Sequence, residues 1–335
     1  MPETVSHSLS RGSPIKCGLM LPTHAPREKP LDVGLIAATA EWAEASGFDA
    51  LWTGDHIVHP WQFMESLISL AFVAARTKTV GIGTCVLLLP MRQLSVVAAQ
   101  ISTLANLSGG RLRLGIGIGG EWPREWQAAG VALKERGARL DEAVPVLQRL
   151  LAGEVVSVEG RFNSFTDVSV SPVPPPVPFY LAGRAEVALA RVGRLADGWL
   201  GFFVTPNGFR RDSAVIDNAR EQAGRASLPF ERGILLNFHL DTQAAAMARA
   251  LELNLGFPKE LQLDANDEQL KRLGLVGTPE DVVARMQEYI DAGCTTFAVS
   301  PMEKENGAYQ RQVRRFTSEV LPRLKSASIV ADRAV

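Results

Sequence analysis

An Asp-His pair directly follows a short apolar run near the start of the chain. Asp55 and His56 come after the run 49–53, at the point where a loop would begin. An acid beside a histidine in such a place is typical of a proton donor or acceptor whose pKa is set by its surroundings. We therefore predict proton transfer at His56, with a loop-capping histidine as the alternative, whereas capping is the preferred interpretation for His59. The sequence has no Glu/His cluster at metal-ligand spacing at another strand end, so no metal site is expected.

Other side chains with chemical potential also follow apolar runs. Cys85 lies near the end of the run 79–89, but no base or positive charge stands beside it, so we do not expect a nucleophile. Glu121 follows the run 111–118. Arg184 stands at the start of a predicted helix, where a phosphate could bind, with an exposed helix-start charge as the alternative.

A glycine pattern after the fourth run resembles a dinucleotide fingerprint. Gly115, Gly117 and Gly120 satisfy G-x-G-x-x-G. That fingerprint also needs an acidic residue about 20 positions later, at the end of the next strand, but Asp141 stands near that distance inside a helical pattern. Two interpretations remain for the glycines: they let one strand pass close to another, or they leave bare backbone against which a flat ring can lie.

Short apolar runs alternate with helical patterns along the chain. The runs are 15–21, 49–53, 79–89, 111–118, 178–182, 198–203, 233–240 and 295–300. Runs without polar alternation are typical of parallel strands buried on both faces. Eight such units followed by helices predict a (β/α)8 TIM barrel, with an open doubly wound sheet as the rival.

Length and composition agree with one enlarged barrel. The chain has 335 residues, a net charge of −1 and 46% hydrophobic residues. We expect a barrel over 14–325 with insertions near 154–178 and 241–277, flanked by flexible tails at 1–13 and 326–335. The charge balance argues against broad nucleic-acid binding, and no apolar run reaches the ~18 residues of a membrane span. Three cysteines far apart form no disulfide framework, which favours the cytoplasm.

Several segments together resemble the bacterial-luciferase-like superfamily of flavin- and deazaflavin-dependent oxidoreductases. They stand in family order over roughly 15–325: GFDALWTGDHIV (47–58), the stretch VGIGTCVLLLP to GIGIGGEW (80–122), ERGARLDEA (135–143), the RF…FYLAG run (161–183), ALARVGRLADGW (188–199) and GTPEDVVARMQEYIDAGCTTFAV (277–299).

The resemblance implies a TIM barrel with its cofactor at the C-terminal mouth and assigns roles to individual residues. His56 and Glu121 would be catalytic acids or bases. A non-proline cis peptide is implied at Cys85–Val86, behind the cofactor ring. The residues implied to bind the cofactor are Asp55, Thr84, Cys85, Val86, Gly117, Ile118, Gly119, Ala182, Gly183 and Arg184.

Two departures bear on the cofactor and the substrate. A tryptophan that follows the histidine in sugar-phosphate members comes one position later here, at Trp61, and the luciferases place an arginine where Ile118 stands. The resemblance therefore implies hydride transfer with coenzyme F420. The alternatives are an FMN-dependent monooxygenase served by a partner reductase and a non-catalytic flavin-binding relative. We expect Trp61, Trp122 and Trp126 to contact a small-molecule substrate, and the resemblance implies a homodimer.

Overall fold

All eight apolar runs form parallel strands in the computed structural model, which describes residues 14–120, 122–259, 266, 268 and 272–325. The barrel strands are β1 (Lys16–Met20), β3 (Ala50–Thr53), β5 (Gly81–Leu88), β6 (Leu112–Gly117), β9 (Phe179–Ala182), β10 (Gly198–Phe202), β11 (Glu231–Leu240) and β13 (Thr296–Pro301). Within these described residues each strand pairs in parallel with the next, and pairing of β10 with β11 closes the ring. The predicted (β/α)8 barrel is confirmed, and the open sheet is excluded.

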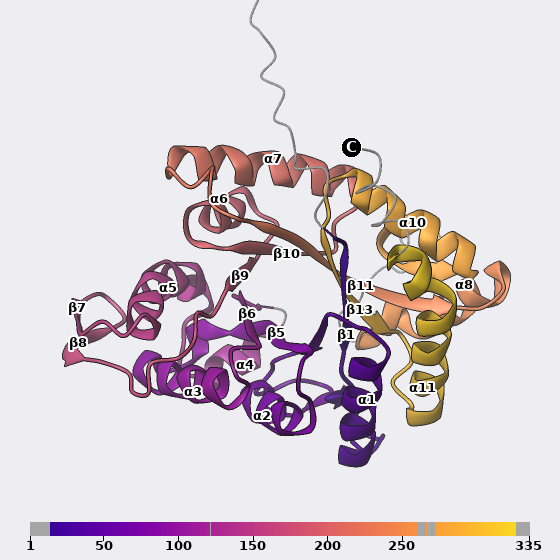
Figure 1. The fold of residues 1–335 in the computed structure, drawn as a ribbon, viewed down its shortest axis with the longest axis horizontal. Helices are drawn as coiled ribbons and strands as arrows, with labels where there is room; N and C mark the ends of the chain where they lie inside the picture. Colours follow the sequence, from indigo (N-terminus) through magenta and orange to yellow (C-terminus); the bar gives the residue numbers. More distant parts are fainter. Residues whose placement is uncertain (1–13, 121, 260–265, 267, 269–271, 326–335) are drawn as a thin grey trace, which may run out of the picture.

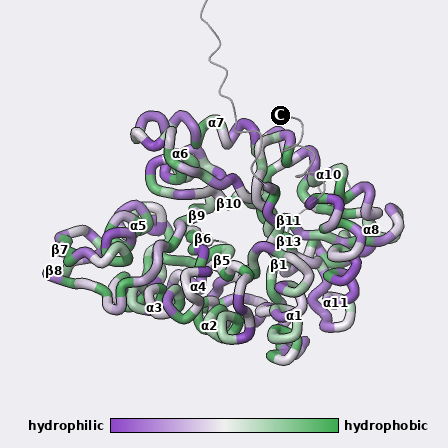
Figure 2. The backbone as a smooth tube through the Cα atoms, viewed as in Figure 1, coloured by the Kyte–Doolittle hydropathy of each residue, from purple (hydrophilic) through white to green (hydrophobic). Residues whose placement is uncertain are grey.

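Helices surround the ring of strands (Figure 1). They are α1 (Val33–Ala45), α2 (Ser66–Arg76), α3 (Leu94–Leu107), α5 (Arg136–Leu151), α6 (Glu186–Leu195), α7 (Pro206–Gln222), α10 (Pro279–Asp291) and α11 (Asn306–Arg315). Hydrophobic and hydrophilic residues alternate along these helices in Figure 2, as expected where one face packs on strands and the other meets water. Helix α10 shows why a helix begins where it does: Thr278 and Asp281 form a reciprocal capping box around Pro279.

The barrel interior is filled by side chains. Its middle layer is an apolar cluster of Met20, Ala50, Trp52, Cys85, Tyr180, Leu200 and Ala298. Trp52 fits because a Cβ at Gly18 would lie 2.3 Å from its Nε1 and a Cβ at Gly83 would lie 2.4 Å from its Cζ3. Large aromatic groups here close the centre of the ring.

Charged side chains close the N-terminal end of the same interior. Glu231 forms ion pairs with Lys16 and Arg113, and Arg113 donates to the Tyr180 hydroxyl at 3.1 Å. These residues stand in the first half of β11, β1, β6 and β9, on the inward face. Ligands therefore have access to the interior from the C-terminal mouth.

Two stretches extend the barrel. The span 154–178 contains the hairpin of β7 (Val156–Glu159) and β8 (Ser164–Val168), which projects from the barrel in Figure 1. The span 241–277 contains α8 (Gln243–Glu252) and β12 (Leu275–Gly277), which pairs with the far end of β11. Both predicted tails lie outside the described residues. Across the part of the chain that the structure describes, none of the helices has the length and apolarity needed to span a bilayer.

Two small elements at the mouth were not predicted. The two-residue strands β2 (His24–Ala25) and β4 (Gln62–Phe63) pair antiparallel and tie the loop after β1 to the loop after β3. The short helix α4 (Pro123–Ala128) follows β6. Elements of two to six residues are too short to show a hydrophobic period, so the sequence pattern could not reveal them.

Candidate active site

The loop after β3 places His56 against a buried carboxylate. Its Nδ1 lies 3.0 Å from Oε2 and 3.2 Å from Oε1 of Glu125, which is fully buried on α4. The backbone N–H of Ile57 also donates to Glu125, at 2.6 Å. A carboxylate bound at Nδ1 fixes the tautomer and the ring orientation, which leaves Nε2 to exchange a proton. The loop and the helix thus build an oriented acid-base group.

Glu125 is a site residue that the sequence predictions missed as a partner. It stands 69 positions from His56, and no local pattern joins the two. The signal that was present is an acidic residue between two tryptophans just after a predicted strand. Glu121, the predicted acid/base of this loop, lies outside the described residues.

His56 belongs to a cluster of aromatic and imidazole side chains. Phe63 is the shared contact of this cluster: its ring centroid lies 4.8 Å from that of His56, 4.7 Å from that of His59 and 4.9 Å from that of His24. Burial and the nearby His56 lower the pKa of His59 to about 3, and its Nδ1 accepts a hydrogen bond from the Trp61 backbone N–H. His59 is therefore neutral near pH 7 and caps its loop, as the preferred interpretation had it. In the described residues no group of three metal-ligating side chains could hold a metal ion.

Asp55 holds the strand ends together rather than facing the mouth. Its carboxylate accepts from the Leu88 backbone N–H at 2.8 Å, from Ser66 Oγ at 3.2 Å and from Arg92 at 2.8 Å, and the residue is 3% exposed. Both oxygens are occupied by protein donors. The structure thus gives no support for direct cofactor contact by Asp55: its contacts fix the end of β5 against the end of β3.

Strand β5 forms the irregular wall of the mouth. The Cys85–Val86 peptide is cis, as the resemblance implies, and the β5–β6 register shifts between Thr84 and Leu87. Thr84 is buried and donates to the Gly115 carbonyl at 2.7 Å. Burial raises the pKa of the Cys85 thiol to about 12, so the thiol stays protonated and is unsuited to be a nucleophile.

The glycines of β6 leave room for this wall. A Cβ at Gly115 would lie 2.1 Å from the Thr84 carbonyl oxygen, and a Cβ at Gly117 would lie 2.4 Å from Val86 Cγ2. The glycine pattern thus lets β6 pass close to β5. Because Gly117 has no side chain, the same positions also leave bare backbone at the mouth. Gly119 has a positive φ of 49°, and Ile118 is half-buried against the core.

The loop after β9 borders an open polar cleft. Arg184 lines a cavity of about 580 Å³ together with residues from the start of α7, among them Thr205, Gly208 and Arg211. The Gly183 carbonyl accepts from Trp199 Nε1, and Ala182 ends the strand half-buried. The start of α7 and two guanidinium groups therefore meet at one cleft. Arg211 pairs with Asp212 at 2.8 Å, which leaves Arg184 as the cation available to a phosphate there.

The three tryptophans expected at the substrate do not share one environment. Trp61 is half-buried and stacks on His24 with ring centroids 6.1 Å apart. Trp122 is half-buried and meets His59 edge-on, with ring centroids 5.0 Å apart. Trp126 is fully buried and its side chain packs in the core, contrary to the substrate contact that was predicted for it. Its ring lies beside Gly119, where an added Cβ would be 3.6 Å from Cζ2.

Comparison with known proteins identifies the family of the chain. The luciferase-like monooxygenase family profile matches residues 15–296. The chain is 30% identical to the F420-dependent glucose-6-phosphate dehydrogenase of Kineococcus radiotolerans, with 94% of this chain and 99% of that protein covered.

Solved structures of low sequence identity share the fold. An F420-dependent secondary alcohol dehydrogenase in complex with an F420-acetone adduct superimposes with a TM-score of 0.81 at 21% identity, covering 93% of this chain and 99% of that one. The oxygenating constituent of 3,6-diketocamphane monooxygenase of Pseudomonas putida, in complex with FMN, gives 0.71 at 18% identity, covering 92% and 98%. From the profile match and the near-complete alignment with its relative, the chain belongs to the luciferase-like monooxygenase family.

Proposed function

We propose that this chain is an oxidoreductase that exchanges a hydride between coenzyme F420 and a small organic substrate. The observation that carries the proposal is the His56–Glu125 pair at the barrel mouth. The Kineococcus relative is named for F420, which supports that cofactor. The luciferases place an arginine where Ile118 stands, and the absence of that arginine also favours F420 over FMN.

The residues present suit a flat ring that carries a phosphate. Val86 and Gly117 would hold the ring, because Gly117 leaves the backbone bare beside Val86. Arg184 and the start of α7 would hold the phosphate. When bound, the cofactor supplies the hydride chemistry, while the protein orients it and excludes side reactions.

The protein's own contribution to the reaction is proton transfer and positioning. His56 exchanges a proton at Nε2, because Glu125 occupies Nδ1. Asp55 acts through Arg92 and the Leu88 amide by fixing the wall behind the ring. Glu121 as a second acid or base, and Trp61 and Trp122 as substrate contacts, complete the proposed site.

An FMN-dependent monooxygenase is the second candidate. The FMN complex of similar fold shows that this barrel architecture can hold a flavin. That reaction would require a partner reductase to supply reduced flavin. For either activity we propose a cytoplasmic enzyme that assembles as a homodimer, and sedimentation of the purified protein would measure the assembly.

The first test is titration of the purified apoprotein with F420 and with FMN, followed by fluorescence. We expect saturable binding of F420 at micromolar concentration or below, and binding of FMN at least tenfold weaker. Tight FMN binding without F420 binding would reverse the ranking of the two cofactors.

The second test replaces His56. His56→Ala is expected to reduce turnover by about 100-fold while F420 affinity stays within about twofold, because the imidazole transfers a proton and does not hold the ring. Glu41→Gln on the exposed face of α1 is the control. Full turnover by His56→Ala would remove the proton-transfer role.

A further inference from the structure

A lysine after β13 reaches the same mouth from the neighbouring strand. On β13 the inward positions are Thr296, Ala298 and Ser300, since Ala298 belongs to the interior cluster. Ser300 is therefore the last inward side chain of the strand. Lys304 turns back over it, with Nζ 3.1 Å from Ser300 Oγ and 2.8 Å from the Pro301 carbonyl. These contacts place the ammonium at the rim of the mouth.

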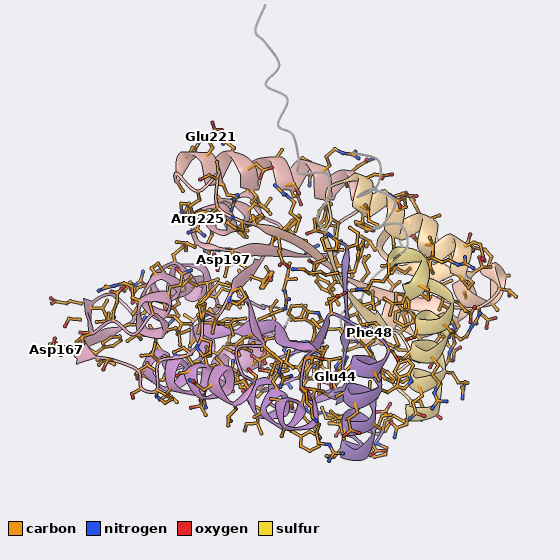
Figure 3. All side chains as sticks on the ribbon, viewed as in Figure 1. Glu44, Phe48, Asp167, Asp197, Glu221 and Arg225 are labelled. Carbon is orange, nitrogen blue, oxygen red and sulfur yellow. The ribbon has the colours of Figure 1, made fainter. Side chains whose placement is uncertain are left out.

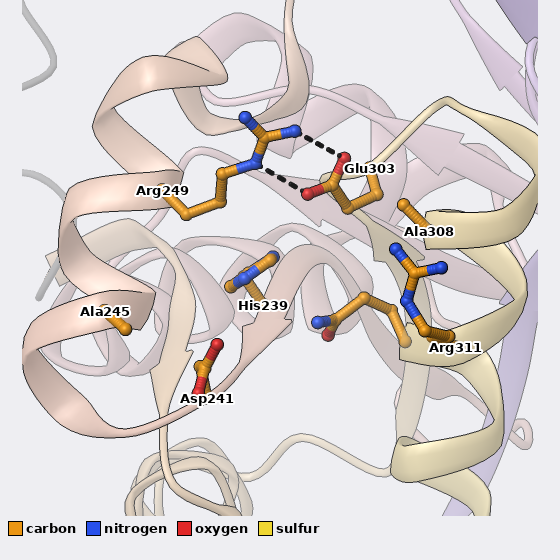
Figure 4. A pocket seen from close by; sticks show the side chains of 8 residues that line it. His239, Asp241, Ala245, Arg249, Glu303, Ala308 and Arg311 are labelled. Atoms are coloured by element: carbon orange, nitrogen blue, oxygen red, sulfur yellow. Dashed lines mark hydrogen bonds and ion pairs between the residues drawn. The ribbon is translucent and has the colours of Figure 1, made fainter.

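The charge of Lys304 is not neutralised within the described part of the chain. Its sequence neighbours are committed elsewhere: Glu303 binds Arg249 through two hydrogen bonds of 2.7 and 3.0 Å, and Glu305 pairs with Lys29. Figure 4 shows the Glu303 carboxylate turned toward Arg249, in the polar cleft between α8 and α11. An ammonium has three N–H donors, and two protein oxygens accept from Lys304. One donor is left for a ligand.

His24 extends this polar side of the mouth. It follows β1, which lies between β13 and β3 in the ring, so the loops that carry Lys304, His24 and His56 are adjacent. The Nδ1 of His24 is buried and has no hydrogen-bond partner. Burial and the charge of Lys304 keep the pKa of His24 well below its usual range, so His24 is neutral. Lys304 is thus the cation on this side of the mouth.

We propose that Lys304 is a further residue of the reaction site, where its ammonium binds the oxygen of a carbonyl substrate. This inference rests on the proposed hydride transfer and names a ketone or aldehyde, with the matching alcohol in reverse, as the substrate class. The reduced cofactor would supply a hydride to the carbonyl carbon and would itself be oxidised. The π electron pair moves onto the oxygen beside Lys304, and the oxygen takes a proton from His56. A fixed cation at a developing oxyanion is a strong source of catalysis.

The surroundings also tune the amine. Burial lowers the pKa of Lys304 to about 7, against the opposing effect of Glu303, with the neutral His24 facing it from β2. The ammonium form is complete below that value and is lost as the pH rises through it. Loss of the Lys304 ammonium should therefore add to the decline of carbonyl reduction above pH 7, and a cation that does not titrate there would remove that contribution and leave the one from the His56 proton.

Kinetics of three variants with F420 and a panel of small ketones and aldehydes test the role. Lys304→Met should lower kcat/KM by about 100- to 1000-fold, with F420 affinity within twofold. Lys304→Arg should recover at least a tenth of the wild-type value and make the decline between pH 7 and 9 shallower. Lys29→Met, in the exposed pair with Glu305, is the matched control. Lys304→Met within twofold of wild type, or an unchanged pH profile in Lys304→Arg, would overturn the proposal.

A readout on the apoprotein separates this proposal from the cofactor assignment. Competitive acetylation with limiting acetic anhydride, read by mass spectrometry, should give a half-point near pH 7 for Lys304, as expected from its lowered pKa. Benzoate, used as an oxyanion probe, should slow the labelling of Lys304 at least fivefold and leave Lys29 unchanged. An ordinary lysine profile without benzoate protection would refute the subsite. Failure of F420 to bind would refute the proposed function alone, since this labelling needs no cofactor.

Discussion

At the residue scale, the proposed acid-base role of His56 depends on its contact with Glu125. Glu125 accepts from His56 Nδ1 and from the Ile57 amide, so its charge is stabilised by the loop that it orients. Without the Glu125 charge, neither the tautomer nor the ring orientation of His56 would be fixed. A carboxylate that never touches the substrate can therefore govern the rate through the histidine.

Glu125→Gln tests this positioning role. The amide keeps the size of the side chain but offers no negative charge, so we expect kcat to fall by about 10- to 100-fold with KM nearly unchanged. Glu125→Asp, which keeps the charge, should recover part of the loss, and Glu41→Gln should behave as wild type. Equal losses in the Gln and Asp variants would show that packing matters and that charge does not.

The residues of the site differ in how far the sequence could predict them. His56 was predictable because it adjoins an acid at a strand end. Lys304 and Glu125 were not, because each acquires its surroundings from a loop distant in sequence, as in the 69-residue separation of Glu125 from His56. The resemblance implied cofactor contact for Asp55, but successive residues point in different directions, and its carboxylate accepts from Arg92.

At the scale of the elements, strands β5 and β6 pack closely at the mouth. Wall residue Val86 of β5 fills the volume that a side chain at Gly117 of β6 would need, so the two positions are coupled. A glycine in a strand usually weakens it, and here it permits the contact that shapes the mouth.

Gly117→Ala should therefore disturb the ring site. The new Cβ would lie 2.4 Å from Val86 Cγ2, and relief of that overlap requires the wall to move. We expect a destabilisation of about 1–3 kcal/mol and at least a tenfold loss of F420 affinity. Adding Val86→Ala should restore part of both. Gly307→Ala on α11 has only an ordinary contact with Arg311 and serves as the control. A lone Gly117→Ala with normal affinity would contradict the coupling.

A carboxylate on α1 ties that helix to the loop before β5. Glu44 accepts from the backbone N–H groups of Lys78, Thr79 and Val80 at 2.9, 2.6 and 2.9 Å, and Figure 3 labels its position on α1. These hydrogen bonds lower the pKa of Glu44 to about 2, against the opposing effect of its partial burial. The ionised carboxylate is therefore the form that stabilises the fold.

The stabilisation by Glu44 should depend on pH with a defined sign. Because the pKa falls from 4.5 in the unfolded chain to about 2 on folding, the contribution is complete above pH 4.5 and is lost as the pH falls toward 2. Glu44→Gln should lower the free energy of unfolding by about 1 kcal/mol at pH 7, a value reduced by solvent screening, and by less at pH 3. Urea unfolding at both pH values measures this difference. If the two proteins differed in free energy of unfolding by the same amount at both pH values, the effect of Glu44→Gln would come from the shape of the side chain and not from its charge.

At the scale of the whole molecule, the fold was the most predictable property. All eight apolar runs became barrel strands because parallel strands with two buried faces have a distinctive composition. No local sequence pattern indicates that β10 pairs with β11. The closed ring was predicted only from the number of strand-helix units. The bridge β2–β4, which brings His24 to Phe63, had no signal at all, since a two-residue pairing is decided by the loops around it.

The filled barrel interior also bears on the order in which cofactor and substrate bind. Trp52 blocks the middle of the ring, and the ion pairs of Glu231 close its base, so every molecule that reacts must use the same opening. With a single entrance, whichever ligand sits deeper arrives first and departs last. A cofactor ring seated against Val86 would thus be loaded before the substrate, and it would be trapped beneath the substrate until the product had gone. We therefore expect ordered binding, in which the cofactor binds before the substrate and leaves after the product.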